Sequence, residues 1–178
     1  MISNSQQTTD NRQQMESKTF NFQLSTFNLI ECVPNFSEGC NIETINAIAD
    51  AIRSVDGVRI LHIDRGEAAN RTVITFVGQA SSVVEAAFRM VRKASELIDM
   101  RTHQGEHPRI GAIDVLPLIP LKNITLAECA ELARALAERI YKELGIPTYC
   151  YEASAYLPEH VNLATSSYSG CNGRGNLT

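Results

Sequence analysis

Two neighbouring runs rich in β-branched residues, with a polar loop between them, constrain the fold of this chain most. Residues 58–63 read VRILHI and residues 72–77 read TVITFV, with DRGEAANR between them. β-Branched and aromatic side chains favour strands, and a polar connection of this length suits two strands that follow each other in one sheet. The sequence therefore predicts a strand pair joined by a solvated loop.

Segments with helical periodicity lie on both sides of this strand pair. Before it, Ile45, Ile48 and Ile52 recur at helical spacing, and Asp56-Gly57 stops the helix. After it, residues 81–100 carry an apolar face along one side of a second helix. The strand pair is therefore predicted to lie between two amphipathic helices.

Capping patterns mark where the later helices begin and end. Ser82 and Glu85 have the spacing of a capping box at the start of the second helix. Thr125 and Glu128 repeat that spacing before a third helix, which Gly145 is expected to end.

Three further segments are predicted as strands: residues 28–36 (NLIECVPNF), 112–121 (AIDVLPLIPL) and 146–152 (IPTYCYE). The full order is then β-α-β-β-α-β-α-β, and its first six elements match the split βαβ, or ferredoxin-like, arrangement. We predict an α+β sandwich, with helices packed on a mixed or antiparallel sheet.

The 178 residues suffice for one ordinary domain. Residues 1–27 are rich in Gln, Ser, Asn and Thr and are predicted to form a disordered leader, residues 28–157 the domain, and residues 158–178 a flexible tail. The net charge of -4 disfavours non-specific binding to nucleic acid or to anionic membranes. Five scattered cysteines without a C-x-x-C, and no secretory signal, favour a reducing, cytoplasmic compartment with buried thiols.

Residues 101–115, RTHQGEHPRIGAIDV, hold the densest group of chemically active side chains. The string from His103 to His107 fits H-x-x-E-H, a zinc-binding pattern that needs both histidines on one helix face. Gly105 weakens a helix there, and Pro108 favours an extended conformation for the residue before it. Both residues argue against the metal site.

Two other interpretations of this loop remain open. The histidines can simply cap loop amides in a solvated turn. Alternatively, an imidazole with a pKa near ~6.5 suits general-base chemistry at neutral pH. In the second interpretation a neighbouring carboxylate, Glu106 or Asp114, orients the histidine, and Arg109 holds an anionic substrate.

Two more loops carry polar groups that allow both a structural and a functional interpretation. In PNFSEG, Asn35 or Ser37 can cap the following helix. The polar loop between the paired strands, from Asp64 to Thr72, can be a solvated connection. In a split βαβ sheet, loops from different strand ends can also converge on one edge.

Together these segments resemble the formiminotransferase family. The matching stretches are ECVPNFSEG (31–39), DRG (64–66), NRTVITFVG (70–78) and LIDMRTHQGEHPRIGAID (97–114). They occur in the family's order, and the resemblance covers roughly residues 29–157, which makes a chance match implausible. Members of the family stand alone or are fused to a cyclodeaminase.

The resemblance implies transfer of a formimino group from N-formimino-L-glutamate to N5 of tetrahydrofolate, the co-substrate, during histidine degradation. The histidine of GEHPR, His107 in this chain, corresponds to the family's general base. The remaining matched positions are assigned to binding of substrate or folate or to loop architecture: Asp64, Asn35, Asn70, Arg71 and Arg109. For Arg71 and Arg109, a structural ion pair with Glu106 or Asp114 is an equal alternative.

One departure from the family bears on activity. Its members have two subdomains with folate held between them, and this chain resembles the first alone. Such a chain can act as an enzyme with a homodimeric partner or with a separate polypeptide that carries the second subdomain. It can also be a short, non-catalytic module that binds folate or dimerises.

Overall fold

The structure is a computed structural model that describes residues 27–105, 111–157 and 161. The predicted leader and tail lie almost wholly outside these residues and stay predictions. So do Glu106, His107 and Arg109 of the GEHPR motif, whose positions are not described.

A six-stranded antiparallel sheet forms the centre of the domain. Its order is β5-β2-β4-β1-β6, and β3 pairs with the other edge of β4. The strands are β1 (Leu29–Cys32), β2 (Asn35–Phe36), β3 (Val58–Gly66), β4 (Arg71–Gln79), β5 (Ile113–Val115) and β6 (Leu118–Lys122). The path β3-β4-β1-β6 is the strand order of a split βαβ sheet, so the predicted α+β fold is confirmed.

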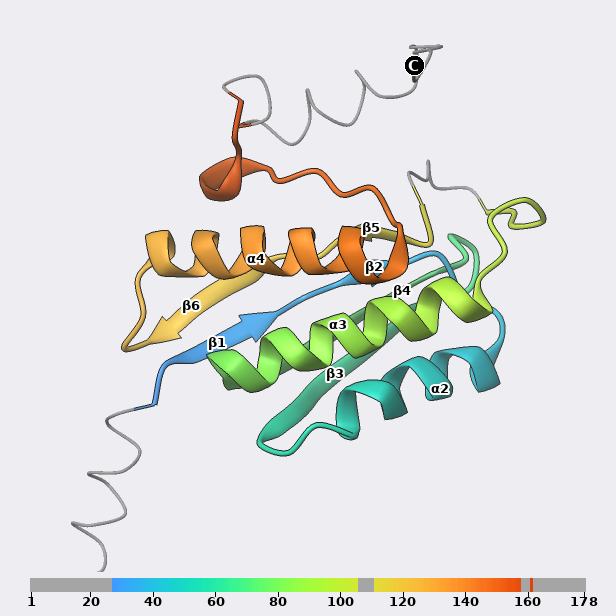
Figure 1. Ribbon diagram of the computed structural model, residues 1–178. Coiled ribbons are helices and arrows are strands. Elements are labelled where there is room, and N and C mark those ends of the chain that lie inside the picture. The colour runs from blue at the N-terminus through green and yellow to red at the C-terminus, as the bar shows by residue number, and fades with distance from the viewer. Residues whose placement is uncertain (1–26, 106–110, 158–160, 162–178) are drawn as a thin grey trace, which may run out of the picture.

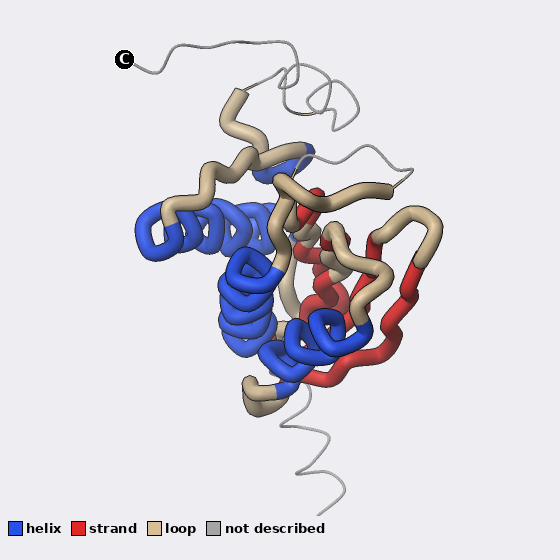
Figure 2. Tube along the Cα trace, turned by 90° about the vertical axis from the view of Figure 1, so that its right-hand side faces the viewer, coloured by secondary structure: helices blue, strands red, loops and turns tan. Residues whose placement is uncertain are grey.

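Three helices cover one face of the sheet: α2 (Ile42–Arg53), α3 (Ala80–Leu97) and α4 (Leu126–Leu144). Figure 1 shows them in front of the strands, and Figure 2, turned by 90°, shows helices on one side and strands on the other. Alternate residues of β4, such as Ile74 and Phe76, are fully buried against this layer. No helix among the described residues covers the opposite face, here called the open face.

Two prolines divide strands that the sequence predicts as continuous. The predicted strand 28–36 is split into β1 and β2 around Pro34, and 112–121 is split into β5 and β6 around Pro117. Proline has no amide hydrogen to donate to a sheet, so it ends regular pairing. The carbonyl of Pro34 still accepts from the Ile74 amide at 3.2 Å, which keeps β1 and β2 along the same edge of β4.

Asn41, and not Asn35 or Ser37, caps α2. Its side chain accepts from the amides of Glu43 and Thr44, at 3.0 and 3.1 Å. Asn35 instead pairs in β2, because the chain continues as a strand for two residues after Pro34. The cap predicted from the sequence is therefore wrong, since the helix begins several residues later.

The two predicted capping boxes have opposite outcomes. Thr125 and Glu128 form one at the start of α4, and Gly145 ends that helix with φ of 68°, as predicted. The box predicted at Ser82 is wrong, because β4 runs directly into α3 and the helix already begins at Ala80. The Ala80 amide donates to the Asn28 carbonyl at 2.8 Å. Glu85 consequently lies beyond the first turn.

Glu85 instead links the helices to one another. Its carboxylate contacts Arg89 on the same helix and Arg139 on α4, both at 2.7 Å. These hydrogen bonds, with Arg139 the larger contributor, lower the pKa of the Glu85 carboxyl.

The predicted last strand, 146–152, is also wrong. This segment runs back along α4 without joining the sheet (Figure 1) and leads into a short 3₁₀ turn, η1 (Glu152–Ser154). Arg134 on α4 donates to the carbonyls of Ala153 and Ser154, both at 3.1 Å. The β-branched and aromatic residues of the segment favour a strand, but these contacts hold it on the helix layer.

Across the segments that the structure describes, every helix is too short or too polar to cross a bilayer.

Candidate functional site: a loop junction at one end of the sheet

The three motif segments that are far apart in the sequence meet at the Arg71 end of β4. They form a loop junction, defined here as residues 37–41, 66–72, 102–105 and 111–114. In Figure 1 this end of the sheet lies on the right, where α2 begins and α3 ends. Hydrogen bonds between the segments hold the junction together.

Asn70 links two of these segments through its side chain. Its Oδ1 accepts from the Gly39 amide at 2.8 Å, and its Nδ2 donates to the Gln104 carbonyl at 2.7 Å. The backbone of Asn70 is left-handed, with φ of 47°, a conformation that asparagine tolerates better than most residues. The amide group therefore uses both its acceptor and its donor within the chain.

Two fully buried hydroxyl groups complete the links. Ser37 donates from Oγ to the Gly111 carbonyl, and its backbone amide donates to the Ala112 carbonyl, both at 2.9 Å. Thr72 donates from Oγ1 to the Glu38 carbonyl at 2.6 Å. Buried backbone carbonyls need such partners, so these side chains satisfy groups that water does not reach.

Glycines let the segments approach backbone to backbone. A Cβ on Gly39 would lie 2.4 Å from the Gly66 carbonyl oxygen and 2.5 Å from the Arg71 amide nitrogen. A Cβ on Gly105 would lie 2.5 Å from the Ala69 carbonyl oxygen. All three distances are far inside van der Waals contact, so each position requires glycine because of close approach.

A shallow depression of about 430 Å³ opens on the junction. It is lined by residues from all three segments and from the end of α3, including Glu38, Cys40, Asn70, Asp99 and His103. The Glu38 carboxylate accepts hydrogen bonds from the backbone amides of Cys40 and Asn41, both at 2.8 Å. These bonds fix the backbone just before α2. His103 is half-buried here, close to the segment that carries His107 in the sequence.

Arg71 forms an ion pair with Asp114. The Nη2 and Oδ2 atoms are 3.4 Å apart, and the side chains are 18% and 5% exposed. This pair is one of the structural alternatives that the sequence allows for Arg71. Removing one partner would leave the other charge poorly solvated, which is costly in a buried pair.

Two more of the predicted site residues share the open face. Val73 of β4 is in register with Asn35 of β2 on one side and with Asp64 of β3 on the other. Residues opposite one another in neighbouring strands point to the same face. Asn35 and Asp64 therefore flank Val73 on the face without helices, and Arg71, two residues before Val73, shares that face.

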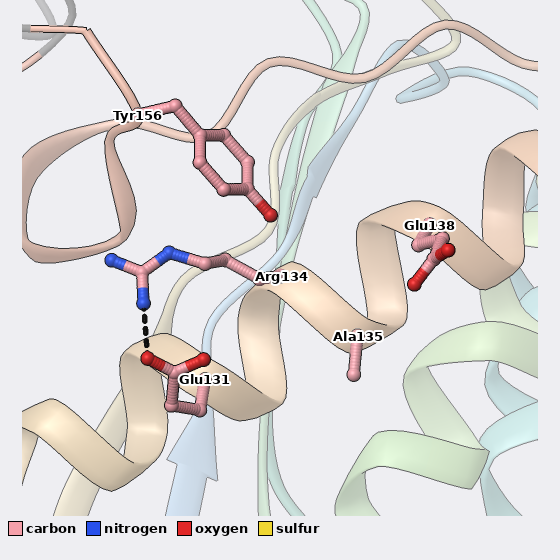
Figure 3. Close-up of a pocket in the computed structure, with 5 residues that line it drawn as sticks. All are labelled: Glu131, Arg134, Ala135, Glu138 and Tyr156. Carbon is pink, nitrogen blue, oxygen red and sulfur yellow. Dashed lines mark hydrogen bonds and ion pairs between the residues drawn. The ribbon is translucent and has the colours of Figure 1, made fainter.

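A second hollow lies far along α4 and is not part of this site. Its lining is Glu131, Arg134, Ala135, Glu138 and Tyr156. Figure 3 shows Arg134 between Glu131, which it contacts at 2.5 Å, and the ring of Tyr156. Together with the carbonyls of the segment after α4, these contacts give the guanidinium a structural role.

The described residues contain no group of three or more His, Cys, Asp or Glu side chains that could hold a metal ion. Of the cysteines described, Cys32 and Cys129 are buried, Cys150 is half-buried and Cys40 is exposed. Burial raises the pKa of the Cys32 thiol, so this thiol stays protonated in the core.

Comparisons with known proteins agree with the motifs. Residues 29–170 match the family described as formiminotransferase domain, N-terminal subdomain. The chain is 50% identical to the glutamate formimidoyltransferase of Streptococcus pyogenes serotype M1 over 136 residues, which cover 76% of this chain and 46% of the relative. For the glutamate formimidoyltransferase of Thermoplasma acidophilum the identity is also 50% over 136 residues, covering 76% and 45%.

A fused relative matches to the same degree. The formimidoyltransferase-cyclodeaminase of Rattus norvegicus is 50% identical over 135 residues, which cover 76% of this chain and 25% of the relative. The matched part of this chain thus spans less than half the length of each of these relatives.

Proposed function

Because the chain belongs to the formiminotransferase family and matches its N-terminal subdomain, we propose that it takes part in formimidoyl transfer. The donor is N-formimino-L-glutamate, the acceptor is N5 of tetrahydrofolate, and the reaction serves histidine degradation in the cytoplasm. The observation that carries the proposal is the loop junction. It brings the three family motifs together beside the open face of the sheet.

His107 is the general base of the proposed reaction. The N5 nitrogen attacks the formimino carbon, which forms a new C–N bond and a tetrahedral adduct. His107 accepts the proton that N5 loses. As the bond between carbon and the glutamate nitrogen breaks, the imidazolium returns a proton to that nitrogen. Protons are conserved within one cycle, and a group with a pKa near ~6.5 is suited to both steps at neutral pH.

Substrate binding is proposed for the polar residues of the open face and of the GEHPR segment. Asp64 and Asn35 lie on either side of Val73 and offer acceptors and a donor to the pterin ring of the folate. Arg109 is proposed to bind a carboxylate of the donor by paired hydrogen bonds. Arg71 is held by Asp114 beside the same face, so we assign it to loop architecture.

The test is a transfer assay with purified chain, tetrahydrofolate and N-formimino-L-glutamate. The His107→Ala change should lower kcat by about 10²- to 10⁴-fold, the usual contribution of a general base. The variant should keep the circular dichroism spectrum and melting temperature of the parent. Lys142→Ala, at an exposed residue of α4 in the helix layer, serves as the control and should retain transfer. Full transfer by the His107 variant would refute the assignment.

A second candidate is a non-catalytic module that binds folate or dimerises. The contacts of Asn70 and Arg71 favour it, since both side chains are used in bonds within the chain. Calorimetry with tetrahydrofolate separates the candidates when it is run beside the transfer assay. Binding without turnover supports the module. Turnover that appears only after a polypeptide carrying the family's C-terminal subdomain is added supports a two-part enzyme.

A further inference from the structure

We infer that Asn70 is a positioning residue, one that holds Gln104 and Gly105, the described residues just before Glu106, against the PNFSEG segment. The inference rests on the proposed function for its effect on transfer. The clamp itself, meaning the two hydrogen bonds of the Asn70 side chain to Gly39 and Gln104, rests on described contacts. The sequence left open whether Asn70 binds substrate or shapes a loop, and the contacts of its amide favour the second role.

The contacts of Asn70 tie segments that no secondary structure connects. Gly39 and Gln104 are 31 and 34 residues away in the sequence, and one planar amide bonds to both. An asparagine amide suits this position because it offers an acceptor and a donor at once. Asn70 ends a turn in which its backbone amide donates to the Glu67 carbonyl at 3.0 Å. Its φ there is left-handed, at 47°.

The clamp acts on Gln104 and Gly105, the two residues that precede Glu106 in the sequence. Gly105 packs so closely on the turn before β4 that a Cβ at this position would lie 2.5 Å from the Ala69 carbonyl oxygen and 3.0 Å from the Asn70 Cβ. Gly105 therefore lies directly against the backbone turn that carries Asn70. The far end of the segment, at Gly111, is tied by Ser37 at 2.9 Å. Ser37 and Gly39 belong to one short loop. Gln104 and Gly111 are therefore both linked to that loop, Gln104 through Asn70 and Gly111 through Ser37.

The chemistry predicts how substitutions differ. Asn70→Asp keeps an acceptor for the Gly39 amide but replaces the donor to Gln104 with an oxygen facing an oxygen. Asn70→Gly removes both bonds and still permits the left-handed backbone. Aspartate and glycine both tolerate this φ, so neither change introduces backbone strain that would confuse the result.

Asn123 provides a matched control at the other end of the sheet. It also has a left-handed backbone, with φ of 56°, and its Nδ2 also donates to a carbonyl, that of Phe27 at 3.2 Å. It follows β6 directly, whose last residue, Lys122, is in register with Leu29, and Leu29 pairs with Gln79 at the far end of β4. Asn123→Asp therefore makes the same chemical change away from the loop junction.

The experiment measures steady-state transfer together with amide hydrogen exchange in the full chain. For Asn70→Asp we expect kcat to fall about 10- to 100-fold, because a small misplacement of a catalytic group is costly. The KM values for folate and donor should change less than about 3-fold, because a residue that does not touch substrate leaves binding intact. Asn123→Asp should match the parent in both parameters.

Hydrogen exchange reports on the clamp directly. In Asn70→Asp, residues 102–105 should exchange faster while the Gly39 amide keeps its protection. In Asn70→Gly, the Gly39 amide should also exchange about 5-fold faster or more, as expected for loss of one hydrogen bond. The difference between the two variants separates a specific clamp from general destabilisation.

Each outcome decides the inference. A rise in KM with kcat retained would show that Asn70 contacts substrate, and would overturn it. Unchanged exchange in both Asn70 variants would overturn it as well. If the parent chain shows no transfer with or without a C-terminal subdomain, the proposed function falls, and the exchange pattern alone then supports or overturns the clamp.

Discussion

The middle of the sheet and the loop junction are both closely packed, but different forces hold them. In the middle, Ile74 and Phe76 are fully buried among apolar side chains of the helix layer. In the junction, backbone groups are paired by side chains, and Ser37 and Thr72 are the two polar residues that the described structure buries completely. Apolar packing has no preferred direction, whereas each hydrogen bond has one donor, one acceptor and a narrow geometry.

This difference predicts how each region responds to change. The middle should respond to lost volume, in proportion to the cavity left behind. The junction should respond to single atoms added or removed at particular positions, with a modest cost in stability and a larger cost in loop placement. Two substitutions test this contrast, and a third, outside both regions, gives a reference for surface ion pairs.

The largest effect on stability is expected from Phe76→Ala in the middle of β4. The ring is fully buried, so its removal should lower the free energy of unfolding by about 3–5 kcal/mol. That is a large share of the roughly 5–15 kcal/mol typical of a domain. Urea denaturation measures it. Val77→Ala, one residue on and facing the open face, is the control and should cost less than about 1.5 kcal/mol. Equal losses would mean that the open face is as closely packed as the helix-covered one.

An intermediate effect is expected from Gly39→Ala in the junction. The new methyl group would lie 2.4 Å from one backbone atom and 2.5 Å from another, so one segment must move. Overpacking of this kind costs about 1–3 kcal/mol. Gly111→Ala is the matched control, because the nearest atom to its Cβ is 3.6 Å away, an ordinary contact. Thermal melting of both variants checks the prediction, which fails if the two melt alike.

The smallest effect is expected from Glu85→Gln, outside both regions. Arg139 and Arg89 lower the pKa of the carboxyl, so the ion pairs stabilise the fold above the unfolded-state pKa near 4.5. That stability is lost as pH falls through the lower, folded-state pKa. The side chain is 32% exposed, so the loss at pH 7 should be about 0.5 kcal/mol. Urea denaturation at pH 7 and pH 3.5 should show the difference between parent and variant shrinking in acid.

Much of the fold was predictable because helix and strand periodicity is local. The amphipathic faces of α2, α3 and α4 and the β3–β4 pair follow from residue types a few positions apart. The failures also share a cause. Ser82 has the spacing of a cap, and 146–152 has the composition of a strand, but contacts with distant residues decided both. The Asn28 carbonyl bonds to Ala80 and so starts α3 early, and Arg134 holds the last segment on α4.

The candidate site divides in the same way. The motifs named Asn35, Asp64, Asn70 and Arg71 as site residues, and the structure places all four at one end of the sheet or on its open face. The role of His107 stays a proposal. Sequence reasoning missed the links made by Ser37 and Thr72, since a hydroxyl's partner 74 or 34 residues away leaves no local pattern. Their position inside PNFSEG and NRT was the one available signal.

The sequence by itself determined the split βαβ order, the helix faces and the family, because each depends on residue identity and spacing along the chain. Only the tertiary structure decided that Gly39 and Gly105 must be glycines and that one asparagine amide joins two loops. Those requirements arise from atoms brought within hydrogen-bond distance by the pairing of β2, β3 and β4. The spacing of residues along the chain does not specify such distances, because they depend on how segments far apart in the sequence pack together.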